Sequence, residues 1–154
     1  GRDLAKLVGW SAELLGDAGR AVLRLLPLFA AASCTEEAMD AAAGGDALAG
    51  LKELFESGLL DYRADPERYG WHQSVMDYAA SLGGQDDAEA KLRLVAYWTE
   101  WGSHRDDLSQ EDMRIRLLER PNLDAALEWA WAAAQGMPSN IAAPLCRRST
   151  WTNA

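Results

Sequence analysis

The chain has 154 residues, of which 49% are hydrophobic, and it carries a formal net charge of −9. That length holds one sizeable domain or two small ones, and the apolar share is ample for a packed core. A nucleic-acid binder normally presents a basic patch to the phosphates, so the acidic balance argues against a nucleic-acid partner. The longest apolar run, residues 21–34, is interrupted by Arg24 and Pro27 and is too short to span a bilayer. We therefore expect no membrane partner and a cytoplasmic location.

The chain shows no sign of catalytic or metal chemistry of its own. Its two cysteines, Cys34 and Cys146, lie far apart without the spacing of a zinc site or a disulfide framework, so we expect two reduced thiols. There is no Gly-rich loop ending in Lys-Ser or Lys-Thr, and no nucleophile has a histidine and an acid at a recognisable spacing. We expect no enzyme activity from this chain. Because it begins at Gly1 rather than methionine, we expect a piece of a longer protein.

Three helices are predicted in the first half. Apolar residues at helical spacing predict one helix, or a broken pair of helices, over residues 12–26, ending before Pro27. Thr35 is the expected cap of a second, short helix that stops at the glycine pair 44–45. Asp46 is the expected cap of a third helix that runs to residue 57, with an inner face made of Leu48, Leu51, Leu54 and Phe55.

A hairpin and a fourth helix are predicted next. Residues 57–63 predict a strand, residues 65–67 a turn with Pro66 in its first central position, and residues 68–71 a second strand. Ser74 is the expected cap of the following helix, whose inner residues are Val75, Tyr78, Ala79 and Leu82. His72 lies at the strand-to-helix junction, where it can face whatever docks there. The order helix, helix, helix, strand, strand, helix is typical of a winged helix with a two-stranded β-hairpin wing.

We place a domain boundary at the glycine-rich break, giving a winged-helix domain over residues 1–83 and a helical segment over residues 84–154. The second part predicts helices over residues 87–102, from Ser109 to just before Pro121, and from Asn122 to Gly136. The inner face of the last helix is expected to hold Leu123, Ala126, Leu127, Ala130, Trp131 and Ala134. Antiparallel helix pairs of this length are typical of an α-solenoid of the tetratricopeptide (TPR-like) type, so the fold class is mainly α. Residues 139–154 carry no usable signal.

Seven tryptophans are many for this length. Trp71 alternates with Tyr69 along one strand, and this is most simply explained by core packing. Burial between repeat helices is the simplest explanation for most of the others. Trp129 lies off the helix face that Trp131 helps to define, so we expect Trp129, together with Trp101, to contact another domain or a partner.

Two parts of the chain resemble a known family. Residues 25–29, 48–51, 57–60 and 69–79 resemble, over roughly residues 14–82, the winged-helix region of STAND signalling NTPases, the class that includes NB-ARC proteins. In the family, the last of these segments contains Met-His-Asp followed by a helix, whereas this chain has Trp71-His72-Gln73. The histidine is kept and both flanking residues differ. Residues 119–130 look like the helix that opens the TPR-like region in bacterial members.

The resemblance implies a nucleotide-dependent switch. An upstream P-loop domain, outside these residues, would bind ADP or ATP, and the winged helix would fold over it with His72 touching the nucleotide phosphates in the resting state. The chain itself would hold no cofactor. Its partners would be the upstream nucleotide-binding domain, a downstream repeat domain of the same chain, and a protein partner. Gln73 in place of the family's acid can orient a neighbour but cannot carry charge.

Two other functions stay open. A DNA-binding winged-helix transcription regulator would need a basic third helix, yet residues 46–57 hold Asp46, Glu53 and Glu56 against Lys52. A helical-repeat scaffold would bind a protein partner through the tryptophan-rich second half, and His72 would then be a packing histidine.

Overall fold

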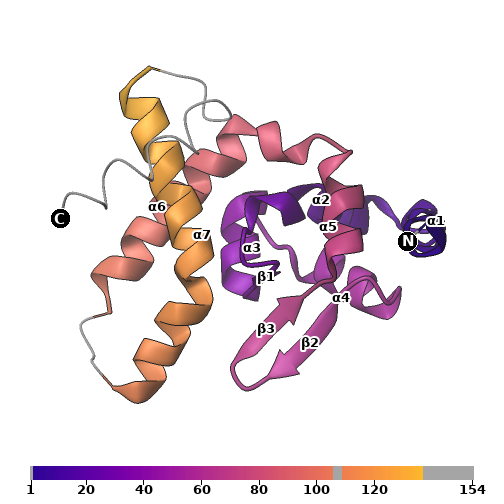
Figure 1. Cartoon of the computed structure of the whole chain (residues 1–154), viewed down its shortest axis with the longest axis horizontal. Coiled ribbons are helices and arrows are strands. Elements are labelled where there is room, and N and C mark those ends of the chain that lie inside the picture. The colour runs from indigo at the N-terminus through magenta and orange to yellow at the C-terminus, as the bar shows by residue number, and fades with distance from the viewer. Residues whose placement is uncertain (1, 106–108, 137–154) are drawn as a thin grey trace.

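The computed structural model of the protein describes residues 2–105 and 109–136 (Figure 1). The fold is mainly helical with one small antiparallel sheet, which confirms the expected class at that level. None of the helices in these described ranges combines the length and the apolar character needed to cross a bilayer. With η marking a short 3-10 helix, the elements are α1 (Arg2–Glu13), α2 (Asp17–Leu25), η1 (Leu26–Leu28), β1 (Ser33–Cys34), α3 (Glu36–Ala43), α4 (Leu48–Glu56), β2 (Asp61–Ala64), β3 (Glu67–Gly70), α5 (Gln73–Ala80), η2 (Gly84–Asp86), α6 (Ala88–Ser103) and α7 (Gln110–Ala134).

The helices surround a centre made of α2, α3 and β1. Helix α1 packs on α5, α2 packs on both α3 and α4, α3 packs on α6, and α6 packs on α7. In Figure 1 the α6–α7 pair stands on one side of the molecule and α1 on the other, with the β2–β3 hairpin projecting between them. The hairpin is therefore the element that reaches outward from the helical body.

The predicted hairpin is present as β2 and β3, but the sheet has a third strand that was not predicted and runs in the order β1-β3-β2. The additional strand, β1, pairs antiparallel with β3, with Ser33 opposite Gly70. The first hairpin strand starts only at Asp61, four residues later than predicted. Because Ala64 pairs with Glu67, the turn places Pro66 in its second central position, after a cis peptide bond, and not in the first as predicted.

The predicted helix caps are confirmed only in part. The Thr35 side chain accepts a hydrogen bond from the Ala38 amide at 3.2 Å, and α3 ends at Gly44, whose φ of +74° suits glycine. Asp46 is not the cap of α4, because the helix begins one residue later than expected. Its carboxylate instead accepts from the Leu48 amide at 3.0 Å.

Within the predicted span 12–26 the chain is broken, and its second part is α2, which ends before Pro27 as expected. Most of α1 lies before this span and was not predicted. Helix α1 reaches back to the start of the described chain. The Glu53 carboxylate of α4 accepts hydrogen bonds from the amides of Gly16 and Gly19 at the start of α2. A carboxylate at a helix amino end is favourable because it meets the positive end of the helix dipole. This contact holds α4 tightly against α2.

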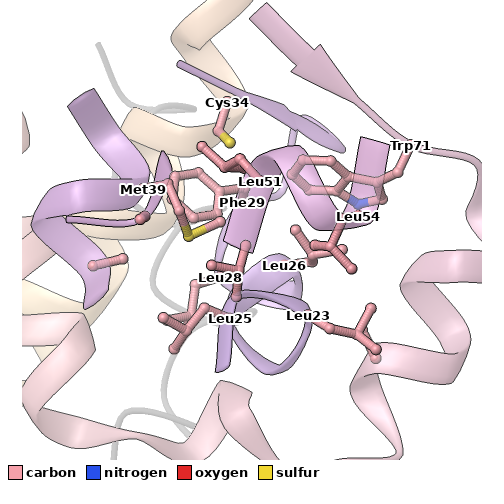
Figure 2. Packing of buried hydrophobic residues seen from close by; sticks show 14 of the residues in the cluster. Leu23, Leu25, Leu26, Leu28, Phe29, Cys34, Met39, Leu51, Leu54 and Trp71 are labelled. Carbon is pink, nitrogen blue, oxygen red and sulfur yellow. The ribbon is translucent and has the colours of Figure 1, made fainter. Parts of the chain in front are cut away.

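One continuous apolar cluster fills the interior. Phe29, Leu26 and Leu54 lie at its centre, fully or almost fully buried, and the Trp71 indole packs among them (Figure 2). Trp71 meets Phe29 edge to face, with ring centroids 6.4 Å apart, a favoured geometry for an aromatic pair. The cluster also includes Leu94 and Trp98 of α6 and Ala126 of α7. The apolar interior thus extends across the glycine-rich break, and the domain boundary at residue 83 stays a prediction.

Helix α7 differs most from expectation. Two helices separated by Pro121 were predicted, but one helix of 25 residues runs through the proline, and Asn122 caps nothing. Proline lacks the amide that would bond the carbonyl of Leu117. Both Pro121 and Leu117 are exposed, so water can take the place of that amide. The predicted cap at the start of this helix is confirmed, since Ser109 accepts from the Asp112 amide at 3.1 Å.

Five apolar residues expected to face inward are exposed. Phe55 is 49%, Leu82 38%, Leu127 56% and Trp131 47% exposed, and Ala134 is exposed as well. The buried face of α7 includes Ala126 and Ala132 together with the polar residues Glu119 and Asn122, so the large apolar residues Leu127 and Trp131 lie outside it. Simple apolar periodicity cannot detect this, since it assigns every large apolar residue to the core.

We predict that Gly50→Ala destabilises the protein through the α2–α4 contact. A Cβ at Gly50 would lie 2.4 Å from the Ala18 carbonyl oxygen and 2.4 Å from a Val22 methyl group. Because backbone must move to relieve such overlap, the free energy of unfolding should fall by about 1–3 kcal/mol in urea denaturation. Gly45→Ala is the matched control, since a Cβ there meets nothing within 4 Å. Equal stabilities of the two variants would contradict the close approach.

Candidate functional site

His72 is exposed and lies between β3 and α5. Trp71, the residue before it, is held in place by two contacts. The Trp71 amide donates to the Ala32 carbonyl at 3.1 Å, extending the β1–β3 pairing, and the Trp71 side chain is buried against Phe29. His72 is therefore held at a defined point on the surface although its own ring is exposed.

The imidazole of His72 caps helix α5. Its Nδ1 accepts a hydrogen bond from the Ser74 amide at 3.0 Å, so His72 takes the capping role that was predicted for Ser74. A ring nitrogen that accepts from an amide carries no proton. The neutral ring consequently carries its hydrogen on Nε2, which is then a donor for another group.

The Ser74 hydroxyl also lies 2.9 Å from Nδ1 of His72. A serine beside a histidine resembles a nucleophile and its base, but catalytic pairs also need a third group that orients the base. Among the residues that the structure describes, no carboxylate is hydrogen-bonded to the His72 ring. The contact is best understood as part of the helix cap.

A shallow hollow of about 480 Å³ adjoins His72. Leu4 and Ala5 of α1 line one side, and His72, Gln73 and Asp77 line the other. Gln73 donates its side-chain amide to the Asp77 carboxylate at 2.8 Å. The acid missing next to the histidine in sequence is thus found one helical turn later, on the same hollow.

Trp71, the other residue flanking His72, does not reach this hollow. It is 7% exposed and points into the apolar cluster among Leu26 and Leu54 (Figure 2). Its indole Nε1 is buried without a hydrogen-bond partner among the described residues, a cost that the large apolar ring offsets. Trp71 positions His72 through the backbone and takes no direct part in the hollow.

The structure does not bring Trp101 and Trp129 to the His72 hollow. They lie on α6 and α7 and are half-buried. Trp101 packs against Trp98 and carries the Arg105 guanidinium 4.1 Å above its ring. The Trp129 ring lies 5.7 Å from the Lys91 ammonium. Both rings are thus partly covered by cationic side chains of the same chain, and their contact with another domain or partner stays a prediction.

A buried polar network joins the sheet to α7. We call it the clamp: Ser33 of β1, Arg68 of β3, and Glu119 and Asn122 of α7. Arg68 donates to Glu119 at 2.8 Å and to the Ser33 hydroxyl at 2.8 Å. Arg68 is 6% and Glu119 1% exposed, so this is a buried ion pair. Such a pair is tolerated only when its remaining hydrogen-bonding capacity is filled.

Asn122 fills that capacity. Its amide nitrogen donates to Glu119 at 3.1 Å and to the Ser33 carbonyl at 3.3 Å, while its oxygen accepts from the Ala31 amide at 3.0 Å. A single side chain thereby satisfies the backbone on both sides of the loop that leads into β1. Sequence reasoning missed the clamp because Arg, Glu and Asn are ordinarily surface residues. The only local signal was the i, i+3 spacing of Glu119 and Asn122.

Cys34 lies beside the clamp and is fully buried. Burial raises the pKa of its thiol well above the usual range, an effect that Arg68 opposes and Glu119 strengthens. The thiol is therefore neutral and unreactive. It is also free, as expected, while Cys146 lies outside the described residues.

The His72 hollow offers an imidazole N–H donor, an amide and a carboxylate, which suit the binding of a polar group. Within residues 2–105 and 109–136, no three His, Cys, Asp or Glu side chains are grouped so as to hold a metal ion. Comparison of the chain with models of protein families, with curated proteins and with solved structures finds no match.

We predict that His72→Ala lowers the free energy of unfolding by about 1 kcal/mol, because the Ser74 amide loses its acceptor. His72→Asn should keep near-normal stability, since asparagine is a strong helix cap. Thermal and urea denaturation measure both. A loss in His72→Asn as large as in His72→Ala would mean that the cap is not what the side chain contributes.

The clamp generates a second prediction. Arg68→Met or Glu119→Leu alone leaves a buried charge without its partner, and each should cost about 3–5 kcal/mol in urea denaturation. The double variant should be more stable than either single one. Arg63→Met is the matched control, because Arg63 lies opposite Arg68 on the next strand and is exposed. Independent, additive losses at Arg68 and Glu119 would contradict a coupled pair.

Proposed function

We propose that the chain is a non-catalytic regulatory segment of a STAND NTPase of the NB-ARC type. Residues 1–83 act as a winged helix that closes over an upstream domain binding ADP or ATP, and residues 84–154 begin a helical-repeat relay. The observation that carries the proposal is His72, an exposed histidine at the strand-to-helix junction whose helix-capping Nδ1 leaves Nε2–H as a donor.

The order of elements supports the winged-helix assignment. Helices α2, α3 and α4 precede the β2–β3 hairpin, and α5 follows it. The strand β1 lies between α2 and α3 and pairs with the hairpin, an arrangement compatible with a wing anchored on the helical body. The hairpin projects from the molecule as a wing does (Figure 1).

The position of His72 suits a phosphate contact. An imidazole N–H can donate to a phosphate oxygen, and a charged acceptor makes that bond stronger than a neutral one. His72 also sits at the amino end of α5, where the helix dipole favours an anion. Loss of this contact when the domains separate would couple the nucleotide state to the shape of the protein.

The clamp supplies a physical route from the nucleotide contact to the repeat helices. Arg68 belongs to β3 and lies four residues before His72, and its partner Glu119 belongs to α7. A buried ion pair with filled hydrogen bonds favours one fixed arrangement of strand and helix over a sliding contact. A displacement of α7 would thus also displace β3.

The electrostatics of α4 oppose the DNA-binding alternative. This helix would enter the major groove, yet it carries Glu53 and Glu56 with Lys52 as its only basic residue. Glu53 is engaged by the amino end of α2, which turns that part of α4 inward. Lys52 is thus the single cation that α4 could offer to a base edge.

A helical scaffold is a second candidate function, favoured by one observation. Leu127 and Trp131 are four residues apart on α7 and are both about half exposed, as expected of a surface that a further helix covers. The two proposals differ in whether His72 is needed for function: the switch requires this histidine and the scaffold does not.

The test is nucleotide retention in the longer protein that carries this segment. His72→Asn keeps the helix cap but removes the imidazole donor, so bound ADP should be released roughly tenfold faster, as expected for a lost hydrogen bond to a charged group. His104→Asn is the matched control, because His104 is the other histidine of the chain and is exposed just after the end of α6. Unchanged ADP retention and signalling in His72→Asn would contradict the switch and favour the scaffold.

A further inference from the structure

A second hollow, of about 550 Å³, lies between the start of α3, the end of α4 and the β2–β3 hairpin. Three aromatic rings line it, those of Phe55, Tyr62 and Tyr69. Tyr62 and Tyr69 are paired across the hairpin and so share one face, with ring centroids 5.2 Å apart and planes at 54°. Phe55 is 49% and Tyr62 43% exposed, so these rings keep apolar area that the core does not use.

The same hollow is strongly acidic. Glu36 and Glu37 at the start of α3 and Glu67 of β3 line it, and Lys52 is the opposing charge among its described lining residues. Partial burial, together with the Glu67 and Glu36 carboxylates, raises the pKa of both tyrosines. Nearby negative charge disfavours a phenolate in this way, and the same charge attracts a cation.

We propose that this aromatic and acidic hollow binds the guanidinium group of an arginine presented by a partner peptide. A guanidinium stacks on aromatic rings and can donate two parallel hydrogen bonds to a carboxylate. The more strongly hydrated ammonium of lysine gains less from such a site. The three carboxylates would repel an anionic group, and a purely apolar group would gain nothing from their charge.

The protein contains an internal example of this type of binding. The Arg105 guanidinium lies 4.1 Å from the centre of the Trp101 ring and donates to the Asp112 carboxylate at 2.7 Å. An aromatic face and a carboxylate together therefore hold an arginine in this fold. The hollow at Phe55, Tyr62 and Tyr69 offers the same two components without an arginine from the chain among its described lining residues.

This site is separate from the His72 hollow, with which it shares no lining residue. It lies on the face of the hairpin that carries Tyr62 and Tyr69, whereas alternation along β3 puts Arg68 and the clamp on the other face. Arginine binding here neither requires nor excludes nucleotide sensing by His72.

The test is a titration of the isotope-labelled chain with a blocked Gly-Arg-Gly peptide, followed by NMR. Saturable shifts should appear at Phe55, Tyr62 and Tyr69. Blocked Gly-citrulline-Gly, which keeps the shape and loses the charge, should bind at least about fivefold more weakly. If the citrulline peptide bound as tightly as the arginine peptide, a cation site would be overturned. If a blocked Gly-Lys-Gly peptide bound as tightly as the arginine peptide, the assignment to arginine would be overturned.

Two variants locate the site. Glu67→Gln removes one carboxylate, and Tyr62→Leu keeps apolar volume but removes the π face; both residues are exposed, and each change should weaken arginine binding about fivefold. Glu13→Gln on α1 is the matched control, since it removes the same charge from an exposed position outside the hollow. Unchanged affinity in both Glu67→Gln and Tyr62→Leu, or an equal loss in Glu13→Gln, would overturn the location. Circular dichroism checks that each variant is folded.

Discussion

The buried Arg68–Glu119 ion pair is the constraint on which the rest of the structure depends. Removing both charges from water is costly, and the attraction between them offsets that cost only because Ser33 and Asn122 fill the remaining hydrogen bonds. The network thereby links three segments that are remote in sequence. It also fixes strand register, because a slip of β3 by one residue would turn Arg68 to the opposite face of the sheet.

The position of His72 follows from that register. After Arg68, the next residues of β3 pair with β1, and the Trp71 amide continues the pairing to Ala32 while its indole enters the core. His72 comes immediately afterwards, at the only point where the chain leaves the sheet and starts α5. The proposed nucleotide contact and the placement of α7 are thus determined by one short strand, which gives the proposed relay a mechanical basis.

Sequence reasoning identified part of the local signals, since the caps expected at Asp46 and Asn122 are not formed, and it missed the tertiary contacts. The caps at Thr35 and Ser109 and the end of α2 before Pro27 depend on neighbouring residues, and they were predicted. The strand β1 and the continuity of α7 through Pro121 depend on contacts with distant polar residues, so periodicity could not reveal them. The place of His72 at the strand-to-helix junction was predicted, but its capping role was assigned to Ser74. The partial exposure of Phe55 was missed because a large apolar residue at helical spacing is normally assigned to the core.

We propose that α7 and the His72 junction are coupled through the clamp, and hydrogen exchange at the Ser74 amide reports on this coupling. That amide donates to His72, whereas the hydrogen bonds of the Asn122 side chain go to Glu119, to Ser33 of β1 and to Ala31 just before it. In Asn122→Ala, we expect faster hydrogen exchange of the backbone amides at Ser74 and along β1 and β3, with little change in α1. Faster exchange confined to α7, with Ser74 protected as in the unaltered protein, would contradict the coupling.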